Sequence, residues 1–445
     1  MKSREENYPI FTEEMKKTHK ILMPMMLEPH FSLLCEVLRD EGYDIELLRT
    51  NHSSIAEEGL KYTHNDMCYP AILVIGQFID ALKSGKYDTH RTALIITQTG
   101  GGCRASNYIH LLRKALKSSG YEYVPVISAS ASNLEKHEGF KLSINAIYKC
   151  MNVLLYGDFL LCIYNQARSH EVVKGESAQA LQESVEFLKA TMKTGSLGKR
   201  KENYMYILEK FNNIALYDKV KPRVGIVGEI YMKYSALGNN KLEEFLIEEG
   251  AEPVVSGFID FLLYCISNSQ SDRVLYNIKS KYEIGRRAFI DYVIKKQREM
   301  INVIENNSRF IAPGDFKEIY NAADGIINKG VKMGEGWLLT AEMVSHIKND
   351  VNNIVCAQPF GCLPNHIVAR GVMGKIRKEY PKANILAIDY DPGASKTNQE
   401  NRLKLMLMNA TYNEKSEDVF NDYIEKKKRQ DEKFVEVEES YAWNR

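Results

Sequence analysis

The sequence lacks closely paired cysteines. Its 445 residues include eight cysteines, but no C-x-x-C spacing occurs anywhere. A zinc ribbon, a thioredoxin-like site and the compact ferredoxin motif all depend on such pairs. In a large intracellular chain, dispersed cysteines are expected to be reduced thiols rather than a disulfide framework. Any metal site must therefore draw its ligands from distant parts of the chain.

Other absences narrow the class of protein. No run of about 18 apolar residues occurs, so we expect no membrane-spanning helix. The stretch MKSREENYPIFTEE is charged and lacks the apolar core of a secretion signal, which predicts a cytoplasmic protein. The formal net charge is only +1, so the charge balance gives no reason to expect nucleic acid as a partner. Hydrophobic residues at 44% and charged residues at 26% are typical of a soluble globular protein.

The succession of strand and helix patterns predicts an α/β protein. We expect two or three Rossmann- or flavodoxin-like parallel-sheet domains with helical insertions. The expected parts are a first α/β domain (1–132), a helical segment (133–220), a second α/β domain with a helical extension (221–330), a third α/β unit (331–411) and a charged C-terminal tail or helix (412–445).

Three cysteines are expected at strand ends or helix starts. Cys103 follows the apolar strand 92–99 through a run of three glycines, Cys362 follows a strand that ends near Pro359, and Cys68 precedes a helix. Ligands gather at the carboxyl ends of parallel strands, and a helix start favours a thiolate. Each cysteine alone is more often a buried core thiol, but three at such positions indicate a metal cluster between domains.

Two other interpretations of these segments remain open. The stretch TGGGCR invites a phosphate-binding interpretation, with Arg104 binding an anion at the helix start. It matches neither the Walker A spacing nor the dinucleotide-binding spacing, so support for a nucleotide is weak. Cys362 and His366 are four residues apart and would share a helix face as a nucleophile and its base, but Pro364 argues against a helix there.

Six segments of the chain have the character of family motifs: NDMCYPA, TQTGGGCRASNY, VGEIYMKYSALGNNKLEEFLIEEGAE, GEGWLLTAEM, QPFGCLPNHIVARG and ANILAIDYDPGAS. In these segments, and over most of residues 20–410, the chain resembles the 2-hydroxyacyl-CoA dehydratase family. The closest branch looks like the C-terminal module of large activase-related proteins, near the double-cubane cluster proteins.

The resemblance implies an oxygen-sensitive iron–sulfur protein of anaerobic metabolism. Its cofactor would be a [4Fe-4S] or a double-cubane [8Fe-9S] cluster, with Cys68, Cys103 and Cys362 as ligands and Cys356 as an additional candidate. The family dehydratases use a single low-potential electron to remove water from a 2-hydroxyacyl thioester, whereas the double-cubane proteins reduce small molecules. The electron comes from a separate ATP-hydrolysing activator that has its own iron–sulfur cluster.

The implied function is therefore a low-potential reductase or a dehydratase-like component, acting on an acyl-CoA or a small molecule. A homodimer or heterodimer is expected, without nucleic acid or membrane partners. Because they flank strand ends, Glu229 and His366 are candidate catalytic residues, and Arg104 and Gln358 are candidate substrate contacts. The chain lacks the ATPase module of the activases, so a partner must supply electrons. The alternatives are a non-catalytic structural or regulatory subunit and a clusterless α/β protein that binds CoA or a nucleotide.

Overall fold

The strands of this protein form two parallel sheets. The computed structural model describes residues 8–98, 102–129, 135–278 and 280–410. Within them, two four-stranded sheets have the orders β2-β1-β3-β4 and β6-β5-β7-β8, and every pairing is parallel. The predicted α/β class with parallel sheets is confirmed. The strands are β1 (Lys20–Pro24), β2 (Asp44–Leu48), β3 (Thr92–Thr97), β4 (Val126–Ala129), β5 (Arg223–Gly228), β6 (Glu252–Val255), β7 (Asn353–Pro359) and β8 (Asn384–Tyr390).

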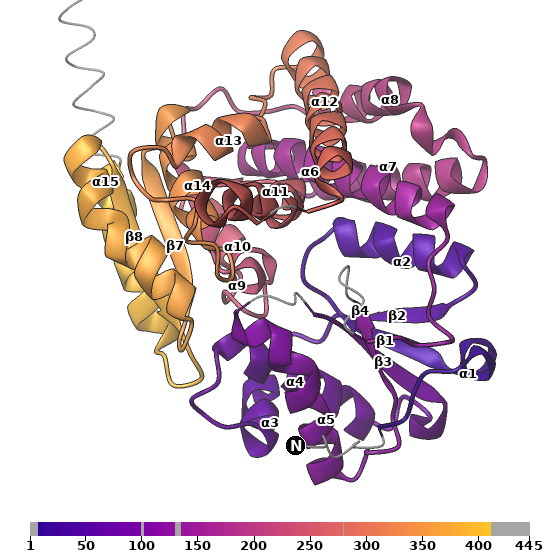
Figure 1. Ribbon diagram of the computed structural model, residues 1–445. Coiled ribbons are helices and arrows are strands. Elements are labelled where there is room, and N and C mark those ends of the chain that lie inside the picture. The colour runs from indigo at the N-terminus through magenta and orange to yellow at the C-terminus, as the bar shows by residue number, and fades with distance from the viewer. Residues whose placement is uncertain (1–7, 99–101, 130–134, 279, 411–445) are drawn as a thin grey trace, which may run out of the picture.

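The first sheet is covered by helices on both faces (Figure 1). Leu22, Leu94 and Ile96 pack against one helical layer, while their strand neighbours, such as Ile21 and Ile95, face the other side. This alternation follows from the two-residue period of a strand. The first sheet and the helices around it form the first lobe. Its helices are α1 (Glu13–Thr18), α2 (His30–Asp40), α3 (Ser54–Tyr62), α4 (Tyr69–Lys83), η1 (Thr89–Arg91), η2 (Arg104–Asn107) and α5 (Tyr108–Ser119).

The second sheet combines two segments that the sequence suggested as separate units. Strands β5 and β6 come from 221–330, and β7 and β8 come from 331–411, but β7 pairs with both β5 and β8. These segments therefore build one lobe around one sheet. Its helices are α9 (Ile230–Tyr234), α10 (Leu242–Glu248), α14 (Trp337–Lys348), the π-helical turn η4 (Asn365–Ala369), η5 (Arg370–Val372) and α15 (Met373–Glu379), followed by a helical stretch over 396–410.

A helical layer joins the two lobes. The long helix α6 (Ile144–His170) contacts α2 of the first lobe and β6 of the second (Figure 1). Around it lie α7 (Glu176–Lys193), η3 (Ser196–Gly198), α8 (Arg200–Asn212), α11 (Phe258–Tyr276), α12 (Glu283–Asn307) and α13 (Phe316–Ala322). By length and hydropathy α6 is a candidate membrane span, but 72% of its apolar window is buried within the protein, and the core helix of a soluble protein meets the same criteria.

Each sheet has a point where the strand order reverses. In the first sheet it lies between β1 and β3, and in the second it lies between β5 and β7. Open parallel sheets bind ligands beyond the carboxyl ends of the strands at such a point. Cys103 follows β3, Glu229 follows β5, and Cys362 follows β7. The expected third unit with Cys362 thus contributes to the reversal point of the second sheet.

Candidate metal centre

Cys68 forms the N-cap of α4. Its backbone is extended, and the helix starts at the next residue, with Pro70 in the first turn, where a missing N–H costs nothing. The sequence pattern also placed Cys68 just before a helix. The thiol is buried, and its Sγ lies 2.8 Å from the hydroxyl oxygen of Tyr108, the first residue of α5.

Cys103 forms the N-cap of η2, which leads directly into α5. Gly100 and Gly101 of the preceding glycine run lie outside the described residues. The half-buried Cys103 thiol faces a loop of the other lobe, because a Cβ added to Gly334 would lie only 3.7 Å from its Sγ. Gly334 has a φ of +59°, which favours glycine, and a Cβ there would also lie 3.0 Å from the ring of Pro364.

Cys362 follows β7 and precedes the helical stretch that starts at residue 363 and includes η4. The side-chain Nδ2 of Asn365 donates a hydrogen bond to its Sγ at 3.2 Å. Gly361 turns the chain into this position with a φ of +75°, and a Cβ there would approach the Cα of Cys68 to 3.5 Å. All three cysteines therefore immediately precede a helix, where backbone N–H groups stabilise negative charge.

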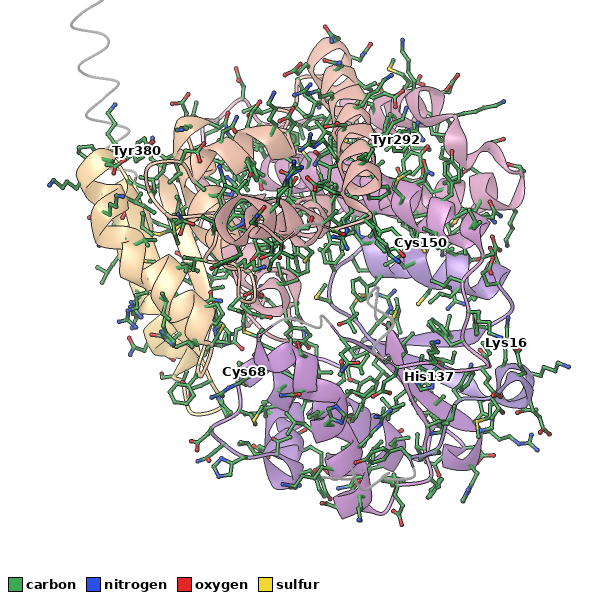
Figure 2. All side chains as sticks on the ribbon, in the orientation of Figure 1. Lys16, Cys68, His137, Cys150, Tyr292 and Tyr380 are labelled. Carbon is green, nitrogen blue, oxygen red and sulfur yellow. The ribbon has the colours of Figure 1, made fainter. Side chains whose placement is uncertain are left out.

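Hydrogen bonds join the loops that carry the cysteines. The N–H of Tyr69 donates to the carbonyl of Phe360 in the other lobe, and within the first lobe the Arg104 guanidinium donates to the carbonyl of Asp66. Figure 2 shows Cys68 at the end of α4 that faces the second lobe. These contacts bring a thiol that follows β7 to two thiols of the first lobe, although Cys362 comes 259 residues after Cys103.

The thiols hold their protons in the metal-free protein. Burial raises the pKa of Cys68 and of Cys362, and it raises the pKa of Cys103 to about 11. The charge of Glu229 adds to this effect at all three thiols. A metal that binds here must therefore displace protons, so binding is expected to strengthen as the pH rises.

Two carboxyl groups belong to the same neighbourhood. Glu229 is the N-cap of α9, and Glu335 lies between two glycines with positive φ just before α14. Both carboxyl groups raise the pKa of Cys103 and of Cys362. Glu229 was a candidate from the sequence, whereas Glu335 was missed. The available signal was the G-E-G triplet at the start of GEGWLLTAEM, where two glycines free the backbone around one buried acid.

The thiols are not gathered around a single ion. Among the described residues, no group of three or more His, Cys, Asp and Glu side chains could hold one metal ion. A mononuclear site requires that all donors converge on one centre, whereas an iron–sulfur cluster binds each thiolate to a different iron and keeps the sulfurs apart. Three separate thiols, two of which have a side-chain hydrogen-bond partner, fit the donor set of a cluster of several irons.

Two further candidates lie inside the second lobe rather than at the site. Cys356 is fully buried in β7, and its thiol packs in the hydrophobic cluster formed with α14 and α15. Gln358 is also fully buried, and its Nε2 donates to the carbonyl of Asn365 at 3.1 Å. Gln358 thereby supports the turn that carries Cys362, and its assignment to substrate binding stays a prediction.

The remaining candidates lie closer to the surface. His366 is half-buried in η4, and its backbone N–H donates to the carbonyl of Cys362. Arg104 is exposed, but its guanidinium donates a hydrogen bond to the backbone carbonyl of Asp66. The assignments of His366 to catalysis and of Arg104 to substrate remain predictions.

Comparison with protein-family models and with curated proteins finds no match to this chain.

Proposed function

We propose that this protein binds an iron–sulfur cluster through Cys68, Cys103 and Cys362, as a low-potential reductase or a dehydratase-like component. The observation that carries the proposal is the arrangement of these thiols. They come from three remote segments, and each immediately precedes a helix. The loops of Cys68 and Cys103 are hydrogen-bonded to each other within the first lobe, and the loop of Cys68 is hydrogen-bonded to that of Cys362 in the second.

The residues of the chain have distinct tasks in this proposal. The three thiolates hold the cluster, which when bound supplies one-electron transfer at low potential. Tyr108 and Asn365 direct hydrogen bonds to two of the sulfurs, Gly334 lies beside the sulfur of Cys103, and Gly361 turns the chain into Cys362. Three protein ligands would leave a position free for an acyl-CoA or a small-molecule substrate. Electrons would come from a separate ATP-hydrolysing activator with its own iron–sulfur cluster.

Anaerobic reconstitution with iron and sulfide tests the ligand set. The wild-type protein should retain iron and sulfide after desalting and give a paramagnetic signal on one-electron reduction. The variants Cys68→Ser, Cys103→Ser and Cys362→Ser should each lose most of the iron. Cys356→Ser is the matched control, since this thiol is buried in the strand that leads to the site, and it should retain the cluster.

The outcomes separate the alternatives. A protein that binds no iron after reconstitution contradicts the proposal, as does iron that survives in all three site variants. Retention of a cluster that no added acyl-CoA or activator affects would favour the structural or regulatory subunit. If the activator reduces the cluster only when ATP is hydrolysed, the electron-transfer part of the proposal is supported.

A further inference from the structure

Two buried carboxyl groups share the first turn of α9. Glu229 accepts a hydrogen bond from the N–H of Met232 at 2.9 Å, and Glu335 accepts one from the N–H of Ile230 at 3.4 Å. The two amides are two residues apart on one turn, so the carboxyl groups are neighbours. Glu335 is only 5% exposed, and its second carboxyl oxygen, Oε2, is buried and has no hydrogen-bond partner. A buried carboxyl oxygen without a partner is costly when ionised and is better accommodated with a proton.

The surrounding charges do not neutralise this pair. Lys233 is the cation that lowers the pKa of both carboxyl groups, but its ammonium is already paired with Glu342 at 2.8 Å in the protein interior. Burial raises the pKa of Glu229, and the charge of Glu335 raises it further. The other titratable groups around the pair are Cys68, Cys103, Tyr108, Tyr231, Tyr264, Cys265 and Cys362.

We propose that Glu229 and Glu335 form a redox-linked proton site, which takes up one proton when the cluster on the neighbouring thiols accepts one electron. The inference rests on the proposed function, because it needs a redox-active group at the three cysteines. It adds a task for two carboxyl groups that the ligand set alone does not explain, and it assigns Glu335 a role that the sequence did not indicate.

The coupling follows from electrostatics. One electron from a low-potential donor adds one negative charge to the cluster, and a nearby negative charge favours the protonated form of a carboxyl group. The reaction is balanced as one electron from the donor and one proton from solvent, and the new O–H bond forms on an oxygen of Glu229 or Glu335. Linkage is reciprocal, so a proton bound to the pair must favour reduction to the same extent.

The midpoint potential of the reconstituted cluster, measured with dithionite or titanium(III) citrate from about pH 6 to about pH 10, tests this inference. Where one proton accompanies one electron, the potential should fall by about 59 mV per pH unit. We expect this slope on the alkaline side, because burial raises the pKa of Glu229 to about 8 before any cluster is bound. In Glu229→Gln/Glu335→Gln the slope should disappear, and in Glu335→Gln it should be reduced or displaced along the pH axis.

Asp260→Asn is the matched control. Asp260 is another buried acid whose pKa burial raises, but it accepts a hydrogen bond from Gln297 on α12 and is not among the main influences on the pKa of the three thiols. This variant should keep the wild-type slope. A potential that is independent of pH in the wild type overturns the inference, and so does a slope that persists in the double variant.

The apoprotein provides a readout that needs no cluster. Infrared difference spectra between acidic and alkaline pH should show a protonated carboxyl band in the wild type that is lost in the double variant and kept in Asp260→Asn. If no cluster assembles but this band is present, the proposed function fails while the proton-holding pair is supported. If a cluster assembles and the band is absent, the pair fails while the proposed function is retained.

Discussion

The hydrogen bonds that reach the sulfur atoms differ from one cysteine to the next. Cys68 has the hydroxyl of Tyr108 within 2.8 Å, and Cys362 accepts from the side chain of Asn365, which lies three residues further along the chain. Hydrogen bonds to cluster sulfurs stabilise the reduced form, since that form carries more negative charge. The irons bound to the three thiolates would therefore differ in electron affinity.

Removal of the Tyr108 hydroxyl is expected to lower the reduction potential. In Tyr108→Phe the sulfur of Cys68 loses its side-chain donor, and the shift should be on the order of tens of millivolts, since hydrogen bonds to charged groups contribute about 1.5–3 kcal/mol in total. Potentiometric titration of reconstituted protein measures it. Tyr43→Phe is the control, because that hydroxyl donates to the carbonyl of Lys141, away from the site. Equal potentials for both variants would contradict the expected role of Tyr108.

The stability of the apoprotein should decrease with rising pH because of Glu229. Its pKa is raised from 4.5 to about 8, so the folded state binds this proton more tightly than the unfolded state does. The stabilisation is complete below about pH 4.5 and is lost as the pH rises toward 8, with a slope of about 1.4 kcal/mol per pH unit for one proton.

Urea denaturation at several pH values checks this expectation. In Glu229→Gln the free energy of unfolding should decrease less between about pH 5 and about pH 8, by up to about 1.4 kcal/mol per pH unit. The variant Glu248→Gln changes an exposed residue and should behave as the wild type. Identical pH profiles for wild type and Glu229→Gln would show that this carboxyl group does not change its proton affinity on folding.

At this scale the sequence predicted positions better than contacts. The positions of Cys68, Cys103 and Cys362 at strand ends or helix starts could be predicted from strand and helix patterns, because those patterns are local. Tyr108 and Glu335 could not be predicted, because their contacts with the site depend on how remote helices pack. Cys356 shows the converse problem. It is close to Cys362 in sequence, but the alternation of side chains along β7 directs its thiol into the core.

The loop after β7 is the element that positions the last thiol. It combines Gly361, Cys362 and the π-turn η4, a feature that often marks functional sites. The Gly361 backbone has a left-handed conformation and packs against the start of α4 in the other lobe. The backbone conformation of Gly361 therefore sets the position of the next residue, Cys362.

The effect of Gly361→Ala on the site can be measured by comparison with Gly120→Ala. Gly120 also has a positive φ, of +81°, but a Cβ there would meet nothing within 4 Å. Each variant should lose about 1–2 kcal/mol of stability from backbone strain. Only Gly361→Ala should also lower iron retention, because a change of this strained backbone would displace the neighbouring Cys362, whereas the added Cβ itself would reach Cys68 and Arg104 only at ordinary contact distance. Thermal unfolding and iron analysis measure the two effects, and unchanged iron content in Gly361→Ala would show that this backbone conformation does not position the thiol.

The helical layer depends on a single buried acid of α6. Asp158 accepts the N–H groups of Phe258 and Ile259 at the start of α11, and it hydrogen-bonds the ring of His30 on α2 at 2.7 Å. Three helices are therefore held by one carboxyl group. Asp158→Ala leaves these donors buried without a partner and should destabilise the protein by about 3 kcal/mol, while Asp158→Asn should cost less. Urea midpoints measure this, and equal midpoints for Asp158→Ala and the wild type would contradict it.

Local patterns predicted the strand 92–99 within two residues of β3 and the end of β7 near Pro359, but not the assembly of the second sheet. These strands were recognisable because buried parallel strands have continuous hydrophobic runs. The placement of β7 between β5 and β8 depends on long-range pairing, which periodicity does not encode. The charged segment 412–445 lies outside the described residues, so its prediction as a tail or helix stays a prediction.

For the whole molecule, the proposed ligand set connects two lobes. Cys68 and Cys103 belong to the first lobe, and Cys362 belongs to the second. A ligand that binds only the folded arrangement stabilises it by mass action, by about 2.7 kcal/mol at a concentration about 100 times the dissociation constant. Cluster loading should therefore protect the junction of the lobes as well as the site.

Hydrogen–deuterium exchange of apo and reconstituted protein checks this expectation. Loading should slow exchange around the start of α4 and around the turn after β7, and it should raise the melting temperature by several degrees. Cys362→Ser should abolish the protection on both sides, although the substitution lies in one lobe. Protection confined to the second lobe would contradict a shared site.

The placement of β7 also has a consequence for biosynthesis. The strands β5 and β6 leave the ribosome long before β7, which completes their sheet, and Cys362 is translated 259 residues after Cys103. A nascent chain can offer at most two of the three thiols until residue 362 has been made. Ligation by all three thiols, as proposed, would therefore have to follow the synthesis of β7 and of the loop after it.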